Sequence, residues 1–412
     1  ITVNQLLANI AVTPDTVSEG LGDTVTFSAS ATDQGGSPMP GTIGWRQDAP
    51  AGQYLTIIDY PTASSIRVRI DSGYPNGLRD VAVITAFTER APGDTILASG
   101  VIYNPIIRTL NFLGSQPWAV GIDPRTQLAY VANRGSRQVA VVDVTNNTPV
   151  NFVDVGANPE RVMVDSRNAH VFVTNVIDNT ISVLDAANNG AFLSTMTLGP
   201  SVGFTAVDTS SNLVFIPSAC ADPPVCGRGG SYLHKIDGAT RSFISQDTVQ
   251  LPANGTGVVF DEVNRRVYVA MANDTVAIVD PIAHNIVGLI GVGVTPEGMA
   301  INPVTRKLYV ANMGDQTVSV VDLNTNSLVK NEFVFSNQPQ RIAVDPIKNR
   351  IYVAGYGSFL VDRIDGNTDT NIGYLSVNCS YPNDVAVNPL NRDLFVPCWS
   401  DGQFLTYRYL TH

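Results

Sequence analysis

The chain has 412 residues, of which 15% are charged, and its formal net charge is −11 at pH 7. A chain of this length can bury a large core and has room for more than one domain. No run of five or more basic residues occurs, which argues against nucleic acid as a partner, because phosphate recognition depends on clustered Lys and Arg. No apolar stretch of about 18 residues and no signal-peptide pattern is found, so we expect a soluble, mature chain without a membrane span.

Residues 1–104 consist of short alternating segments such as "DTVTFSASATD" and "DVAVITAFTE", separated by Gly, Pro and Asp turns, and this pattern predicts a β-sandwich. Pro14, the run Gly22–Val25 and Trp45 resemble bacterial immunoglobulin-like domains, although this segment has no cysteine pair. We interpret Trp45 as sandwich core rather than as a ligand platform. Residues 1–8, "ITVNQLLA", extend the first sandwich strand or, alternatively, are donated to a neighbouring molecule.

From about residue 105 onward the chain repeats itself. The segment "TQLAYVANRGSRQVAVVDVTN" from Thr126 returns as "RKLYVANMGDQTVSVVDLNT" from Arg306. Copies of the motif are marked by an aromatic residue, and successive positions differ by 42, 43, 53, 41, 43 and 43 residues. These aromatic residues are Tyr130, Phe172, Phe215, Tyr268, Tyr309, Tyr352 and Phe395.

Each repeat also contains an upstream apolar run that is closed by Asp or Asn, which predicts a strand leading into an Asx-type turn. One period therefore contains four short strands. Seven such periods of about 40 to 45 residues predict a seven-bladed β-propeller over residues 105–412. The closing residues are Asp123, Asp165, Asp208, Asp261, Asn302, Asp345 and Asn388.

The motifs "YVAN" at Tyr130 and Tyr309 and "FVTN" at Phe172 resemble the YVTN family of β-propeller repeat proteins. This resemblance implies a secreted or surface-exposed protein, and it implies no single chemistry. The third and seventh repeats depart from the pattern, because in "FIPS" and "FVPC" we expect Pro217 and Pro397 to end the strand early.

The last repeat contains only three strands, ending in "QFLTYRYL". The missing outer strand is available upstream in "PIIRTLNFLGSQP", before the first complete repeat. We therefore expect residues 106–113 to close the ring by joining the last blade, in a 3+1 arrangement that removes an exposed sheet edge.

The four cysteines lie in loop-like sequence, and no histidine stands near them at a ligand-like spacing. Metal binding is the alternative, but two disulfides are the better interpretation, pairing Cys379 with Cys398 and Cys220 with Cys226. They predict an oxidising location: extracellular, cell-surface or periplasmic. The first pair of cysteines in the chain lies in an insertion, "CADPPVCGRGG", which is either a binding loop or a neutral surface loop.

The loops that enter the first strand of each blade are expected to surround the channel mouth. Their carboxylates could act in acid and base chemistry, or the facing Glu and Arg side chains could simply neutralise one another. No nucleophile elbow, zinc-protease motif or phosphate loop is present, so we expect no cofactor and no metal. The candidate ligand-binding residues are Trp118, Glu160, Arg161, Glu297, Gln340, Arg341, Asn383 and Asp384.

Three functions fit these patterns. The first is a non-enzymatic protein of the cell surface or the secreted fraction, which presents a propeller face to a protein or carbohydrate partner. The second is a propeller lyase or hydrolase that acts at the channel mouth. The third is a subunit of an extracellular filament or surface layer that self-associates through residues 1–8. The sequence favours the first, because it carries no motif of a catalytic site.

Overall fold

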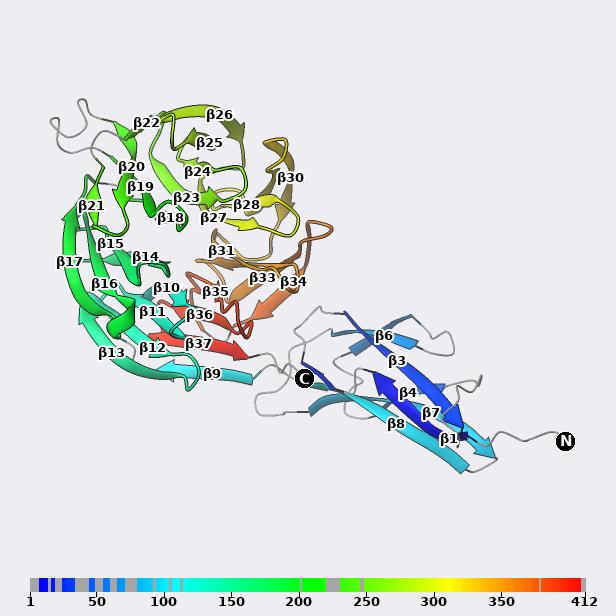
Figure 1. Cartoon of the computed structure of the whole chain (residues 1–412). Helices are drawn as coiled ribbons and strands as arrows, with labels where there is room; N and C mark the ends of the chain where they lie inside the picture. The colour runs from blue at the N-terminus through cyan, green and yellow to red at the C-terminus, as the bar shows by residue number, and fades with distance from the viewer. Residues whose placement is uncertain are drawn as a thin grey trace. The chain divides into compact units, whose positions relative to one another are not determined.

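The computed structural model describes residues 7–13, 16–18, 24–33, 44–48, 55–59, 65–70, 80–91, 94–103, 106–111, 114–200, 202–219, 230–244, 248–377 and 379–408. The chain separates into two compact units (Figure 1). The first contains residues 1–107, with which residues 373–375 and 407–412 are grouped, and the second contains residues 108–372 and 376–406.

The described part of the first unit contains two four-stranded sheets, with strand orders β1-β3-β6-β5 and β2-β8-β7-β4. β2 and β8 are parallel, whereas the other paired strands described in this unit are antiparallel. Most of residues 1–8 and the side chain of Trp45 lie outside the described part. The strands are β1 (Leu7–Thr13), β2 (Thr16–Ser18), β3 (Thr24–Asp33), β4 (Gly44–Asp48), β5 (Leu55–Asp59), β6 (Ser65–Ile70), β7 (Asp80–Ala91) and β8 (Asp94–Tyr103).

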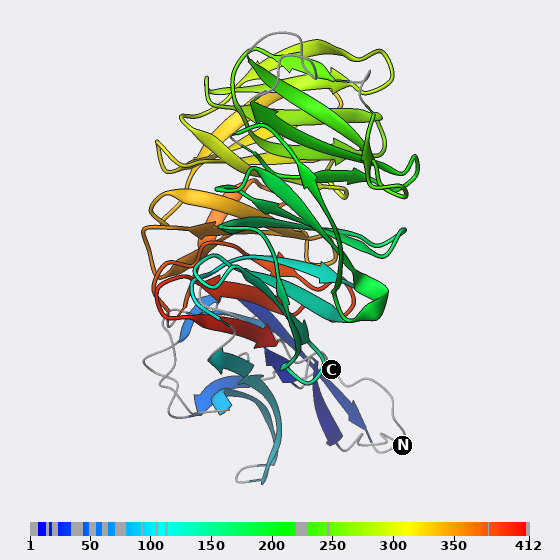
Figure 2. The same ribbon diagram turned by 90° about the vertical axis from the view of Figure 1, so that its left-hand side faces the viewer.

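The second unit is a propeller, and its described residues form seven antiparallel sheets in chain order around a ring (Figure 1). This confirms the predicted seven-bladed, all-β architecture. Figure 2 shows the same strands from the side, where the sheets of successive blades form layers. We number the blades 1 to 7 along the chain.

The strands of blades 1 to 3 are as follows. Blade 1 has β10 (Pro117–Asp123), β11 (Leu128–Asn133), β12 (Gln138–Asp143) and β13 (Thr148–Asp154). Blade 2 has β14 (Pro159–Asp165), β15 (His170–Asn175), β16 (Thr180–Asp185), the short 3-10 helix η2 (Ala186–Asn188) and β17 (Ala191–Thr197). Blade 3 has β18 (Ala206–Asp208), β19 (Leu213–Ala219), β20 (Ser231–Asp237), β21 (Ser242–Phe243) and β22 (Val249–Leu251).

The strands of blades 4 to 7 follow the same plan. Blade 4 has β23 (Gly255–Asp261), β24 (Arg266–Met271), β25 (Thr275–Asp280) and β26 (Asn285–Gly291). Blade 5 has β27 (Pro296–Asn302), β28 (Lys307–Asn312), β29 (Thr317–Asp322) and β30 (Ser327–Phe333). Blade 6 has β31 (Pro339–Asp345), β32 (Arg350–Gly355), β33 (Leu360–Asp365) and β34 (Thr370–Ser376). Blade 7 has β35 (Ala386–Val387), β36 (Leu394–Cys398) and β37 (Gln403–Arg408).

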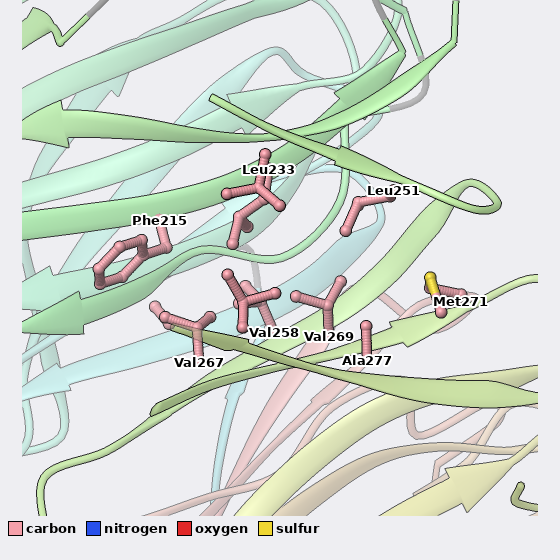
Figure 3. Packing of buried hydrophobic residues seen from close by; sticks show 11 residues of the cluster. Phe215, Leu233, Leu251, Val258, Val267, Val269, Met271 and Ala277 are labelled. Atoms are coloured by element: carbon pink, nitrogen blue, oxygen red, sulfur yellow. The ribbon is translucent and has the colours of Figure 1, made fainter. Parts of the chain in front are cut away.

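The apolar runs of the second and third strands are buried on both faces, because each blade is covered by its two neighbours. The fourth strand is the outer one, and most of its side chains are exposed, as in β13. The core therefore lies between successive blades. Phe215 and Leu233 of blade 3, for example, pack with Val258, Val267 and Val269 of blade 4 (Figure 3).

The aromatic residue that marks each repeat lies in the second strand and is 0–2% exposed in all seven described blades. Burying one such side chain stabilises the fold by roughly 1.5–3 kcal/mol. In each blade the large, rigid aromatic ring fills the equivalent space against the neighbouring blade. The most conspicuous residue of the sequence repeat therefore serves the packing of the core.

The insertion in the third repeat lies between β19 and β20, as the spacing of the repeat predicts. Cys220 and Cys226 belong to this insertion and lie outside the described residues. The predicted bridge between Cys379 and Cys398 is confirmed, with a Cα–Cα distance of 5.8 Å. It joins the loop before β35 to the end of β36 within blade 7.

Blade 7 has the strand order β35-β36-β37-β9, in which β9 (Ile106–Asn111) precedes blade 1 in the chain. The side chains of blade 7 also pack on blade 1, where Phe395 and Phe404 join the cluster that contains Val120 and Ala129. How much β9 contributes to holding the ring closed stays a prediction, and a truncation experiment below addresses it.

Candidate functional site

One end of the blades is built from two loops per blade, and we call it the upper face. The first loop leads into the first strand of the blade. In five blades this strand begins with a proline or is preceded by a proline-containing loop, and the residue before the proline has a positive φ of 50–60°. The carbonyl of that residue accepts a hydrogen bond of 2.9–3.2 Å from the N–H of the residue that follows strand two. The upper face therefore presents the following residue pairs: Gln116 with Arg134, Asn158 with Val176, Thr295 with Met313, Gln338 with Tyr356, and Tyr381 with Trp399.

The charged residues that the sequence placed at the channel mouth form an ion-paired network across blades. Arg161 Nη1 lies 3.2 Å from Glu160 Oε2, and Arg161 Nη2 lies 3.9 Å from Glu297 Oε2. Arg341 Nη1 lies 3.7 Å from the same Glu297 oxygen. Arg134 completes the network, with its Nη2 3.2 Å from Glu160 Oε1. Two glutamates thus face three arginines from blades 1, 2, 5 and 6.

Phe204 provides an apolar floor for two of these arginines. The guanidinium carbon of Arg341 lies 4.0 Å from the centre of the Phe204 ring, and that of Arg161 lies 4.4 Å from it. Such cation–π contacts gain strength when the groups are removed from water. Arg341 is 3% exposed, and burial lowers its pKa to about 9, assisted by the neighbouring charge of Arg161. The arginine pair is thus a packed and partly desolvated unit of the blade ends.

Asp384 couples blade 7 to blade 1 at the same end. Its Oδ2 accepts a hydrogen bond of 3.0 Å from the N–H of Val120, and its Oδ1 accepts one of 2.8 Å from the N–H of Val385. Burial raises the pKa of this carboxyl above its ordinary value, while the charge of Arg341 acts in the opposite direction. Both oxygens are engaged by the backbone, so the carboxyl has a clear structural role.

The remaining predicted residues are largely covered. Trp118 is 8% exposed, and Asn383 is fully buried. Neither the indole N–H of Trp118 nor either amide atom of Asn383 finds a hydrogen-bond partner among the described residues. Gln340 Nε2 donates a 3.4 Å hydrogen bond to Met313 Sδ. The structure therefore brings Glu160, Arg161, Glu297 and Arg341 together, but it moves Trp118 into a different group.

That group is an aromatic cluster of Trp118, Tyr356, Tyr381 and Trp399, which comes from blades 1, 6 and 7. The ring centres lie 5.1 Å apart for Tyr356–Tyr381, 5.6 Å for Tyr381–Trp399, 5.8 Å for Tyr356–Trp399 and 6.0 Å for Trp118–Tyr356. These separations are typical of interacting aromatic pairs. The Arg134 guanidinium lies 4.3 Å from the Trp118 ring centre and links the cluster to the charged network.

Three members of the aromatic cluster escaped the sequence interpretation, although a signal was present. Tyr381 occupies the position where other repeats have Gln116, Asn158 and Gln338, and Trp399 occupies the position of Arg134. Comparing the repeats position by position would have shown this concentration of aromatics in blades 6 and 7. The residues predicted from the sequence follow the loop proline, whereas Tyr381 directly precedes it.

The opposite end of the blades, which we call the lower face, carries the predicted Asx turns. In each of the seven described turns, the Asp or Asn that closes strand one accepts a hydrogen bond of 2.9–3.1 Å from the N–H two residues later. Several of these groups also bind the next blade. Arg306 makes two bonds of 2.8 and 2.7 Å with Asp261, and Asn388 donates to Gln127 at 2.8 Å.

The described histidines lie away from the upper face. His170 begins β15 and His284 lies in the turn after β25, both toward the lower face, while His234 is buried in β20. Across the described ranges, no three His, Cys, Asp or Glu side chains are grouped so that they could hold a metal ion. No helix within those ranges is long and apolar enough to cross a membrane.

The chain matches no protein-family model, and no curated protein matches it. Among solved structures, it is similar to a chain of the hydrazine synthase of Kuenenia stuttgartiensis, with a TM-score of 0.61 and 13% sequence identity. The match covers 71% of this chain and 95% of the other. At this level of identity, the similarity shows the propeller fold alone.

Proposed function

We propose that this chain is a non-enzymatic binding protein of the cell surface or the secreted fraction, which presents the upper face of its propeller to a protein or carbohydrate partner. The observation that carries the proposal is the aromatic cluster, concentrated on blades 6, 7 and 1 at that face. Trp, Tyr and Arg are the residues that most often dominate binding energies at interfaces. The bridge between Cys379 and Cys398 supports an oxidising location.

The charged network favours binding over catalysis. Glu160 and Glu297 both face arginines, and each oxygen of Asp384 accepts a backbone hydrogen bond. A general base must reach a substrate proton with an available lone pair. Groups that already neutralise one another are better suited to holding the ends of the blades together.

A propeller lyase or hydrolase is the second candidate, and the raised pKa of Asp384 is the observation that favours it. A raised pKa is what a carboxyl needs to act as a general acid. Glu160→Gln, Glu297→Gln and Asp384→Asn variants separate the two functions. An enzyme would lose turnover in one of them without a fall in melting temperature. The filament alternative depends on residues 1–8, most of which lie outside the described part.

We further infer that the first unit is an immunoglobulin-like sandwich and that the repeats belong to the YVTN type. The strand orders β1-β3-β6-β5 and β2-β8-β7-β4 support the first inference, because they correspond to the ABED and GFC sheets of immunoglobulin domains. The repeated Y-V-A-N motifs support the second. In this arrangement, the small domain serves as a carrier for the propeller, and β9 closes the ring.

A retention experiment tests the proposed function. The full chain is incubated with isolated cell envelopes of the producing organism, and the bound fraction is measured after washing. We expect a Tyr356→Ala/Tyr381→Gln variant to lose retention. The matched control is Ile347→Thr, which changes a residue of the lower face that is 67% exposed. Equal retention of both variants would contradict a binding role of the upper face.

A further inference from the structure

We infer that the aromatic cluster is a binding site for a neutral oligosaccharide, with one sugar ring stacked on Tyr381. This inference rests on the proposed function and names the ligand class of the upper face.

The fold does not require a tyrosine at position 381. Its φ is 58°, in the left-handed region that bulky residues rarely adopt, and its side chain is 38% exposed. The repeat uses only the carbonyl of this residue, which accepts the N–H of Trp399 at 3.2 Å. Gln116 and Gln338 fulfil the same backbone role in other blades. The positive φ therefore belongs to the repeat, and what distinguishes Tyr381 is an exposed aromatic ring at a position where the backbone role needs no particular side chain.

A covalent link holds this part of the site in place. Cys379 lies two residues before Tyr381, and Cys398 directly precedes Trp399, so their disulfide joins the two segments that carry these rings. An isolated β-bridge between Pro382 and Cys398 adds a main-chain contact. Two segments that are fixed before the ligand arrives lose little freedom on binding, and this favours affinity.

The polar groups near the rings favour a ligand rich in hydroxyl groups. The indole N–H groups of Trp118 and Trp399 are buried and have no hydrogen-bond partner within the described structure. The side-chain amide of Asn383, two residues after Tyr381, is fully buried, and its nitrogen and oxygen likewise have no partner within the described structure. These protein groups include both N–H donors and an amide oxygen acceptor. A ligand hydroxyl group can bind either kind, because it donates one hydrogen bond and accepts two.

Charge and size restrict the ligand further. Arg134 and Glu160 pair with one another at 3.2 Å, and the exposed carboxyl of Asp401 accepts the N–H of Ser380, next to Tyr381, at 2.7 Å. The carboxyl of Asp401 disfavours an anionic ligand, which leaves a neutral one. In the aromatic cluster, Tyr381 is the most exposed ring, Tyr356 and Trp399 are half-buried, and Trp118 is 8% exposed. The cluster therefore offers a small surface centred on Tyr381. A stable protein partner would need roughly 800 Å² on this side.

Tryptophan fluorescence tests the inference directly, because two of the three tryptophans of the chain belong to the cluster. In the full chain, Trp45→Phe removes the remaining one. The probes are cellohexaose, laminarihexaose, maltohexaose and chitohexaose, with hexagalacturonate as the charged comparison. We expect a saturable change with at least one neutral probe, with a Kd on the order of 1 mM or lower.

The variants then locate the site. Tyr381→Gln installs the residue that the repeat itself uses, and it is expected to weaken binding of that probe about tenfold. Phe333→Ala removes an aromatic side chain on the outer strand of blade 5 that is 56% exposed, and it is expected to leave the Kd unchanged. Melting temperatures of both variants establish that they are folded.

The inference is overturned if no neutral probe binds, if only hexagalacturonate binds, or if Tyr381→Gln binds a neutral probe as tightly as the parent chain. These outcomes differ from a failure of the proposed function. If Tyr381→Gln reduces envelope retention while no neutral probe binds, the upper face has a partner of another class. If the variant changes neither retention nor probe binding, both ideas are wrong.

Discussion

The two ends of the propeller use the same repeat in different ways. At the lower face, all seven described turns keep the same contact, in which an Asp or Asn oxygen accepts the N–H two residues later. At the upper face, the loops keep their backbone but change their side chains, from Gln116 to Tyr381 and from Arg134 to Trp399. The side chains that are the same in every repeat are those that the fold needs. Where the backbone is constant and the side chains vary, as at the upper face, the side chains are available for function.

The comparison also separates two kinds of ion pair. Asp261 is 1% exposed and binds both terminal nitrogens of Arg306, so the pair is covered and well oriented. At the upper face, Glu297 makes longer pairs, at 3.7 and 3.9 Å with Arg341 and Arg161, and the two pairs of Glu160 are 3.2 Å long. Short, buried pairs are costly to break, whereas long pairs contribute little. We therefore expect loss of the Asp261–Arg306 pair to lower stability more than loss of the Glu297 pairs, and we expect the exposed side chains of the upper face to affect binding.

The largest effect is expected from opening the ring. A chain that starts at Val101 keeps β9, whereas one that starts at Ser115 lacks it and exposes the edge of β37. Because β9 supplies main-chain hydrogen bonds worth about 1 kcal/mol each, the shorter chain should lose several kcal/mol or fail to fold. Thermal unfolding of the two chains measures this. Equal melting temperatures would show that the segment is only a linker.

The next effect concerns the contacts between blades at the lower face. Asp261→Ala removes the partner of Arg306 and the acceptor of the turn, and it should destabilise the protein by about 3 kcal/mol. Asp261→Asn is the matched control, because the repeat itself has Asn302 and Asn388 at this position. It keeps the turn and should cost about 1 kcal/mol. Urea unfolding of both variants and the parent chain measures the two contributions separately. If Asp261→Asn were as stable as the parent chain, the role assigned to the ion pair would be refuted, and if Asp261→Ala were as stable as Asp261→Asn, the role assigned to the turn would be.

At the upper face, the disulfide should matter most for stability. It closes a loop of 19 residues, so replacing both Cys379 and Cys398 by Ala should cost about 3 kcal/mol on the chain-entropy argument. Urea unfolding of the variant and the parent chain gives the difference. Thiol titration of the denatured, unreduced parent tests the second predicted bridge, between Cys220 and Cys226. Two reactive thiols per chain would show that this bridge does not form.

A loss of stability on acidification is expected from the interior of blade 3. His234 is 5% exposed, and burial lowers its pKa to about 4. Since the unfolded chain takes up this proton near pH 6.5, stability is present above pH 6.5 and is lost as the pH falls toward 4, by about 3 kcal/mol. Urea unfolding between pH 7 and 4 should show this loss in the parent chain and a smaller one in His234→Gln.

The smallest effect on stability is expected from Tyr381→Gln. The backbone contact with Trp399 is kept, and the side chain is already 38% exposed, so the free energy of unfolding should change by less than about 0.5 kcal/mol. Thermal unfolding measures the change. A loss as large as that of the double cysteine variant would mean that the aromatic cluster holds blade 7 together, and the contrast between the two faces would then fail.

Much of the propeller could be predicted from the sequence because its signals are local. The period, the buried aromatic of each second strand and the Asx turns all depend on contacts within a repeat or with its neighbour. Asp123 and Arg125, for instance, meet because they are two residues apart. The disulfide of blade 7 was predictable for the same reason, since Cys379 and Cys398 both lie in one repeat.

Only the tertiary structure decided which side chains of the upper face meet. Trp118 begins blade 1 and Trp399 belongs to blade 7, at opposite ends of the propeller sequence, and their ring centres lie 6.4 Å apart because the ring brings its last blade beside its first. The repeat places Glu297 and Arg161 at the same face, but the closed ring decides that these two side chains meet, with 3.9 Å between Arg161 Nη2 and Glu297 Oε2. A repeat determines where each blade places a side chain, but the direction and length of that side chain depend on packing against neighbours that are distant in sequence.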